Sequence, residues 1–182
     1  IFKGTRSRTA FQIAKEFDAV GGYSNAYTTP ETTCYHAKVM DAHIETMVDV
    51  LSDIFLNSAF DEDEMERERL VIAQEIGMLE DSPEEYVHIL SETAFWGDHP
   101  LGRPISGSRE NVMRFDAGTL KRFFRRLYQP ERIVVSAAGN VDHDRFASLL
   151  EPKFRAVSRG NGFPERQLPT GRSGLCVHPR DL

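Results

Sequence analysis

The feature that most constrains the fold is one amphipathic helix in the first third of the chain. Apolar side chains recur three and four residues apart at Ile44, Met47, Val48, Leu51, Ile54 and Phe55. This spacing places them on one face of a helix. Because such a face must be removed from water, the sequence predicts that the helix packs against a second layer of structure.

A helix and a hairpin are predicted before this segment. Thr9 is a good cap for a helix with apolar residues at helical spacing, and the Gly21-Gly22 pair is typical of its end. The stretch 23–39 is rich in Thr, Tyr and Val, and the pair Pro30-Glu31 lies near its middle. This composition predicts an antiparallel hairpin that turns at the proline.

The rest of the chain is mainly helical in its pattern. Helices are predicted over about 61–79, over 82–96 with Ser82 as its cap, from Asp116 or Thr119 to Leu127, and over 143–154 with Asp142 as its cap. Residues 131–140, ERIVVSAAGN, predict a buried strand. Residues 99–108 read as a loop, and residues 156–170 as a linker.

This order of elements favours an α+β fold over a doubly wound parallel sheet, because strands and helices do not alternate. We expect a mostly antiparallel sheet with helices packed on one face. The chain begins at Ile1 rather than at a methionine, which suggests a piece of a longer protein. The expected domains are a truncated amino-terminal domain over 1–155, and a linker with the start of a following domain over 156–182.

The charge and the cysteines exclude several classes of protein. The net charge is −6, and residues 61–85 hold eleven acidic side chains against two arginines. No basic face is apparent, which argues against nucleic acid as a partner. No apolar run of about 20 residues predicts a membrane span. Cys34 and Cys176 are expected to be packing residues in a reducing compartment, first the cytoplasm, with mitochondrial matrix and periplasm left open.

Two acidic residues interrupt the apolar face of the helix predicted from Asp61. Glu68 and Glu75 share that face with Met65, Val71, Ile72, Met78 and Leu79. A buried carboxylate left alone costs on the order of several kcal/mol, so a partner is expected. Either the two acids pair with cations or reach water, or Glu75 is a metal ligand with Glu68 as a proton-handling neighbour. The sequence contains no histidine pair at metal-ligand spacing to complete a zinc site.

Six motifs in order carry a family resemblance. They are IFKGT at the start, GGYSNAYTTPETTCYHAKV, ERERLVIAQEI, EDSPEEYVH, AFWGDHPLGRPISG and AAGNVDHD. Together they resemble the pitrilysin family of zinc metallopeptidases, closest to its mitochondrial processing peptidase-like bacterial branch, over about residues 1–155. The resemblance implies a processing-peptidase-like metallohydrolase fold.

The resemblance also implies a site and a reaction. Its third zinc ligand falls at Glu75 and an accompanying catalytic carboxylate at Glu68, while its H-x-x-E-H motif is expected just upstream of Ile1. Zinc would acidify a bound water for attack on a peptide bond. The strand similar to SNAYTT would take unfolded peptide as an added strand, which makes Asn25, Ala26 and Tyr27 the substrate-contact candidates.

Two further expectations follow from the resemblance. Such enzymes are clamshells of two related halves, so a second half or a partner subunit is implied, and this chain alone is expected to be inactive. The alternative is a non-catalytic relative that serves as a partner-binding or core subunit. For Asn25, the alternative is a strand residue that bonds its own backbone.

Overall fold

The predicted amphipathic helix is present as α2 (Ile44–Asn57), and it organises the first part of the structure. The computed structural model describes residues 1–157, 159–160 and 165–179. These residues form two compact units, which we describe separately. The first unit is made of Ile1–Tyr27, Thr33–Glu66 and Asp116–Gly162; the second is made of Thr28–Thr32, Arg67–Phe115 and Phe163–Leu182.

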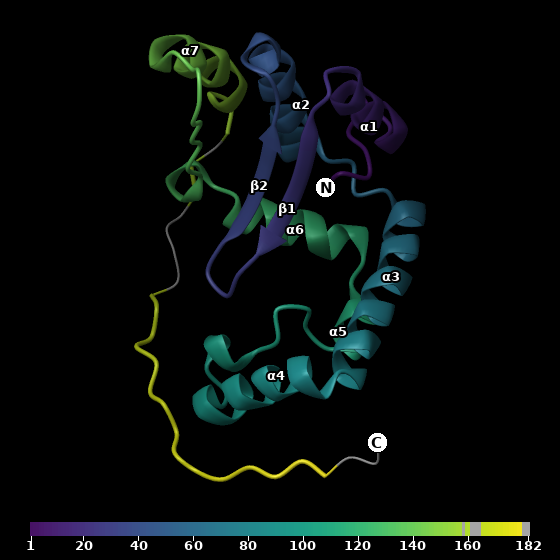
Figure 1. Ribbon diagram of the computed structural model, residues 1–182, viewed down its shortest axis with the longest axis vertical. Helices are drawn as coiled ribbons and strands as arrows, with labels where there is room; N and C mark the ends of the chain where they lie inside the picture. Colours follow the sequence, from purple (N-terminus) through teal and green to yellow (C-terminus); the bar gives the residue numbers. More distant parts are fainter. Residues whose placement is uncertain (158, 161–164, 180–182) are drawn as a thin grey trace. The chain divides into compact units, whose positions relative to one another are not determined.

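The predicted helices and the predicted hairpin are present in the expected order (Figure 1). The α-helices are α1 (Ala10–Ala19), α2, α3 (Glu62–Asp81), α4 (Pro83–Trp96), α5 (Arg109–Arg114), α6 (Ala117–Leu127) and α7 (His143–Phe154). The strands β1 (Tyr23–Thr28) and β2 (Thr33–Lys38) form a two-stranded sheet. Short 3-10 helices are η1 (Asp41–His43), η2 (Pro100–Gly102) and η3 (Pro130–Arg132).

The helix caps explain why several helices begin where they do. The Thr9 hydroxyl accepts a hydrogen bond from the amide of Gln12, and the Gln12 side chain accepts one from the amide of Thr9, which is a complete capping box. Asp116 and Asp142 cap α6 and α7 in the predicted way. Ser82 occupies the cap position of α4, but its side chain makes no capping hydrogen bond.

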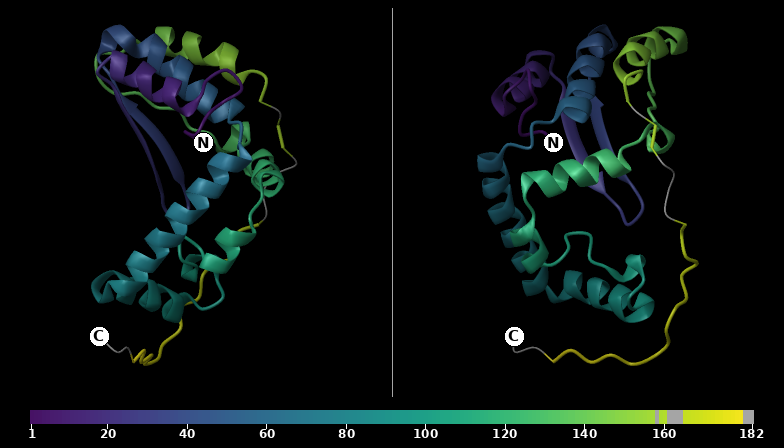
Figure 2. Two further views of the ribbon diagram at one scale, coloured as in Figure 1. Left: turned by 90° about the vertical axis from the view of Figure 1, so that its right-hand side faces the viewer. Right: turned by 180° about the vertical axis from the view of Figure 1, so that it is seen from behind.

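The core of the first unit lies along the buried face of α2. Val50 and Ile54 are each 1 % exposed, and they pack with Ile13 and Phe17 of α1. Burying a side chain of this size contributes about 1.5–3 kcal/mol. The same helix also contacts α7 and β2. The helices α1, α2 and α7 stand on one side of the β1–β2 hairpin (Figure 2), which confirms the expected α+β arrangement.

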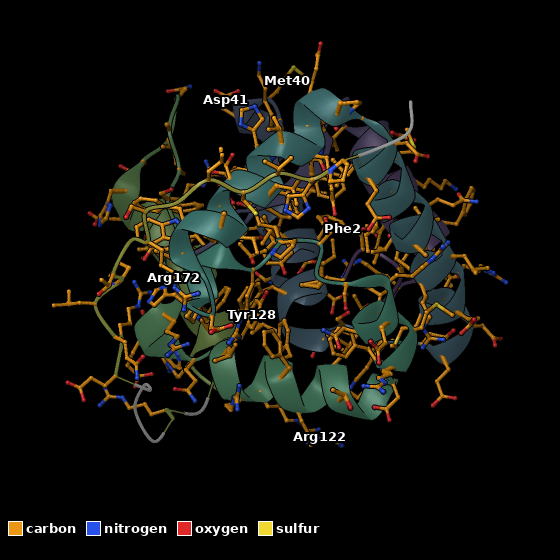
Figure 3. The ribbon with its side chains drawn as sticks, turned by 90° about the horizontal axis from the view of Figure 1, so that it is seen from below. Phe2, Met40, Asp41, Arg122, Tyr128 and Arg172 are labelled. Atoms are coloured by element: carbon orange, nitrogen blue, oxygen red, sulfur yellow. The ribbon has the colours of Figure 1, made fainter. Side chains whose placement is uncertain are left out.

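Tyr35 joins the hairpin to this helical layer. Its ring lies 5.9 Å from that of Phe55 and 6.3 Å from that of Phe2, between ring centroids. Its hydroxyl lies 2.8 Å from the hydroxyl of Tyr128, which is labelled with Phe2 in Figure 3. Burial, followed by the hydrogen bond to Tyr128, raises the pKa of Tyr35. The inner face of β2 is therefore fixed by aromatic packing and one hydroxyl pair.

The strand predicted over 131–140 is wrong for the described residues. Residues 133–138 form no strand there, and the side chain of Val134 is 91 % exposed. Ile133 donates its amide to Pro130 in η3, whereas none of the described residues pairs with the amides of 134–138 as a neighbouring strand. The apolar run has the composition of a strand, but a strand also needs a partner backbone.

The second unit contains a helix that the sequence pattern did not predict. Ser108 accepts a hydrogen bond from the amide of Asn111 and begins the short helix α5, directly after the expected loop. In the same unit α4 contacts η2, where Thr93 donates its hydroxyl to the carbonyl of Gly102. Ser108 was the one sequence signal for the start of this helix. A helix of less than two turns is too short to show a clear apolar period.

One guanidinium joins three acidic side chains in the first unit. Arg8 contacts Glu16 at 2.9 Å, Asp53 at 2.8 Å and Asp49 at 2.5 Å. Lys153 of α7 approaches Asp49 from the other side, at 2.5 Å. The Arg8 side chain is only 19 % exposed, so solvent screens these pairs less than it screens surface pairs. We call these five residues the Arg8 cluster.

The Arg8 cluster predicts a loss of stability in acid. Burial raises the pKa of Asp53, but hydrogen bonds from Arg8, Thr5, Asn57 and Ser7 outweigh it and lower the pKa to about 2. The hydrogen bond from Lys153 likewise lowers the pKa of Asp49. Because the folded state holds these protons less tightly than the unfolded state, their contribution is complete above about pH 4 and is lost toward pH 2.

The variant Asp53→Asn tests this prediction. We expect its free energy of unfolding at pH 7 to fall by about 1–2 kcal/mol, and its decline between pH 4 and pH 2 to be shallower than that of the unchanged chain. Urea unfolding followed by circular dichroism at several pH values measures both. The matched control is Asp18→Asn, at an exposed position of α1. Equal stability of the unchanged chain at pH 6 and pH 2.5 would contradict the prediction.

Candidate functional site

The two acidic candidates lie on α3, in a segment that belongs to the second unit. Glu68 and Glu75 are seven positions apart, so they point to nearly the same side of the helix, about 10 Å apart along its axis. Glu68 is half-buried and has an interaction partner, whereas Glu75 is exposed. The helix therefore presents one carboxylate to water and holds the other in a protein contact.

The predicted apolar face of α3 is not its buried face. The buried residues are Ala73 and Ile76, whereas Val71 is 45 % and Met78 is 73 % exposed. Ala73 and Ile76 lie about one turn apart, so together they mark the side of α3 that packs inward. Glu75 lies on a different side of the helix. Glu75 does not interrupt a core but reaches water, which is one of the alternatives that the sequence left open, so a buried charge does not explain why an acid stands there.

The residues present do not make a metal site by themselves. Among the described residues, no group of three or more His, Cys, Asp or Glu side chains could hold an ion. A catalytic zinc is usually held by three protein side chains, and the printed sequence contains no H-x-x-E-H. The described part of the chain can offer Glu75 as one carboxylate ligand, and it does not fit a complete zinc centre.

The three substrate-contact candidates lie on β1, where the structure places them together. Within the described residues β1 pairs only with β2, so its second edge carries main-chain groups without a ladder partner. Ala26 is half-buried and Tyr27 is 56 % exposed. An edge of this kind is a template for an added strand.

Asn25 uses its side chain inside β1. Its amide nitrogen donates to the Tyr23 hydroxyl at 2.6 Å, and its amide oxygen accepts the backbone N–H of Ala26 at 2.8 Å. These bonds agree with the alternative that we weighed for Asn25, a strand residue that bonds its own backbone. As a substrate contact, Asn25 would act through its main chain.

Two further rings, which the sequence pattern did not single out, lie with Tyr27 on the same face of the hairpin: those of Tyr23 and His36. The His36 ring lies 6.1 Å from the Tyr23 ring and 6.1 Å from the Tyr27 ring, between centroids. The period-two alternation of Tyr23 and Tyr27 on one strand was the signal that could have found them. Interaction with the neighbouring Cys34 thiol raises the pKa of the Tyr27 hydroxyl.

The two cysteines differ from the expectation in one case. Cys34 is half-buried beside Tyr27, in agreement with a packing role. Cys176 is exposed, and its sulfur lies 3.2 Å from Nε2 of His178. The packing role predicted for Cys176 was therefore wrong, because the stretch around it, which includes the 93 % exposed Leu175, is open to water.

Among the described residues, no helix combines the length and the apolar character needed to cross a bilayer. The longest helix, α3, carries acidic residues along most of its length.

Comparison with known sequences identifies relatives along nearly the whole chain. Residues 1–109 match the family Insulinase (Peptidase family M16), and residues 114–176 match its Peptidase M16 inactive domain. The chain is 44 % identical to a protein of Bacillus subtilis named as the uncharacterized zinc protease YmxG, over 97 % of its own length and 46 % of that protein. It is 43 % identical to a zinc protease of Mycobacterium leprae, over 94 % of the chain and 39 % of that protein.

Solved structures give the same answer for the fold. A protease from Helicobacter pylori superposes with a TM-score of 0.81 at 24 % identity, over 94 % of this chain and 41 % of that one. Pitrilysin superposes with a TM-score of 0.79 at 22 % identity, over 93 % and 19 %. The chain spans less than half the length of the curated relatives that it matches best here. On this evidence the chain belongs to the insulinase, or pitrilysin, family of peptidases, M16.

Proposed function

We propose that this chain is the part of a zinc metalloendopeptidase that contributes one metal ligand and the substrate-binding strand, and that it acts on unfolded peptides. The observation that supports the proposal is the family match over residues 1–109, which includes both β1 and the candidate segment of α3. The named zinc proteases that are 43–44 % identical to the chain support the same reaction class.

In this proposal Glu75 is the metal ligand. It is exposed, so its carboxylate needs no loss of a core contact to meet an ion. Glu68, two turns earlier and engaged in a protein contact, has the position of a neighbour that orients or handles protons rather than that of a ligand. The histidine ligands would come from residues outside these 182, and we derive no catalytic step through an ion that the described residues do not hold.

The proposed substrate site is the free edge of β1. Main-chain groups of Asn25, Ala26 and Tyr27 would pair with a peptide in extended conformation. Only an unfolded segment can offer a free strand in this way, which is why the proposed substrate class is unfolded peptide. The second half of the clamshell, or a partner subunit, would supply further contacts. The two free cysteines favour a cytoplasmic-type compartment.

The first prediction concerns the chain by itself. We expect the 182-residue chain to keep less than one equivalent of zinc after dialysis and to show no peptide hydrolysis. One carboxylate without two imidazoles does not hold the ion. Elemental analysis after dialysis and an assay with an unfolded, quenched-fluorescence peptide measure the two quantities. One equivalent of zinc, or hydrolysis that a chelator abolishes, would contradict the proposal that this chain supplies only one of the zinc ligands.

The second prediction concerns the longer protein that carries the histidine motif. We expect Glu75→Gln to lower its zinc content to roughly a tenth or less after dialysis, with an unchanged circular dichroism spectrum, because a neutral amide replaces a charged ligand. The matched control is Glu80→Gln, an exposed acid of the same helix, which should keep its zinc.

The zinc measurement also distinguishes a peptidase from a non-catalytic relative. If Glu75→Gln retains zinc as the control does, Glu75 is not a ligand. If the unchanged longer protein holds no zinc and cleaves no unfolded peptide, the chain is part of a non-catalytic relative that serves as a partner-binding or core subunit.

A further inference from the structure

One face of the β1–β2 hairpin presents three rings to water. Tyr23 and Tyr27 are each 56 % exposed. The half-buried His36 of β2 lies at the same distance, 6.1 Å, from both, with its ring tilted by 51° and 52° against theirs. The equal distances place His36 opposite the midpoint of the pair. We call Tyr23, His36 and Tyr27 the aromatic platform.

The Tyr23 ring is held in place by its own hydroxyl group, which accepts the hydrogen bond from Asn25. The polar end of Tyr23 is therefore used inside the hairpin, and its ring surface is what remains to contact a ligand. Because this ring is held before binding, a ligand that packs on it loses less entropy than it would on a free side chain.

The platform lies beside the edge where the proposed substrate strand would add. In an added strand, alternate side chains fall on the same face of the sheet as Tyr23 and Tyr27. The positions opposite the two tyrosines are four residues apart in the peptide, whether it runs parallel or antiparallel to β1. Side chains directly opposite each other on neighbouring strands touch, and aromatic pairs are among the most favourable.

Resting on the proposed function, we propose that the aromatic platform makes the β1 edge selective for extended peptides that carry aromatic side chains four residues apart. Tyr23 and Tyr27 are then specificity residues of the substrate strand, and Asn25 is a positioning residue that holds the Tyr23 ring.

Two capped nine-residue threonine peptides test the proposal on the 182-residue chain. One carries phenylalanine at its third and seventh positions, and the other carries alanine there. Titration followed by the NMR amide signals of β1 gives both dissociation constants. We expect the phenylalanine peptide to bind about tenfold more tightly, which corresponds to ~1.4 kcal/mol.

Variants of the platform separate ring contact from strand addition. In the double variant Tyr23→Ala with Tyr27→Ala, the two peptides should bind equally, because the rings that distinguish them are absent. The variants Tyr23→Phe and Tyr27→Phe should keep most of the preference because they keep the rings. The matched control is Phe11→Ala on α1, which removes a ring that is even more exposed elsewhere and should keep the full preference.

Every outcome bears on the proposal. If the unchanged chain binds the two peptides equally, selection by the platform is wrong while strand addition at β1 stands. If neither peptide shifts the β1 amides, strand addition itself fails, and the selectivity fails with it, whereas the zinc measurement on Glu75 is unaffected. Loss of alanine-peptide binding in the double variant would show that the hairpin was damaged, and the phenylalanine variants would then decide.

Discussion

The first unit depends on the buried face of α2. One helix contacts α1, α7 and β2, and its residues Val50 and Ile54 are almost completely removed from water. The outer parts of this unit are then fixed relative to α2 by directional contacts. Arg8 ties the chain before α1 to α2 through Asp49 and Asp53, and Lys153 ties α7 to the same Asp49. Apolar burial supplies most of the stabilisation, and the ion pairs determine which surfaces meet.

Local signals in the sequence were sufficient for the elements of the fold. The apolar period of α2, the capping box at Thr9, and the caps Asp116 and Asp142 all have their cause within a few residues, and all are present. The strand expected over 131–140 failed because pairing is not local. Its β-branched residues are suited to a sheet, but none of the described residues supplies the neighbouring strand.

The candidate site shows a different limit of sequence reasoning. The helical wheel assigned Glu68 and Glu75 to a buried face, but apolar residues on a helix do not state which side packs, and Ala73 and Ile76 proved to be the inner ones. The argument for Glu75 now depends on the family rather than on the cost of a buried charge. For Asn25, Ala26 and Tyr27 the strand assignment was correct, while the tyrosine and histidine rings beside them became visible only when two strands were placed side by side.

The exposed stretch after η3 has a consequence for how the first unit opens. Residues 134–138 join α6 to α7 without any backbone bond to a neighbouring strand in the described structure, and Val134 is almost fully solvated. Their amides should exchange with solvent deuterium at nearly the rate of a free peptide. The amides of α2 should exchange only through global unfolding. Within the first unit a protease would therefore cut between these two helices, and the two products would stay together through the core around α2.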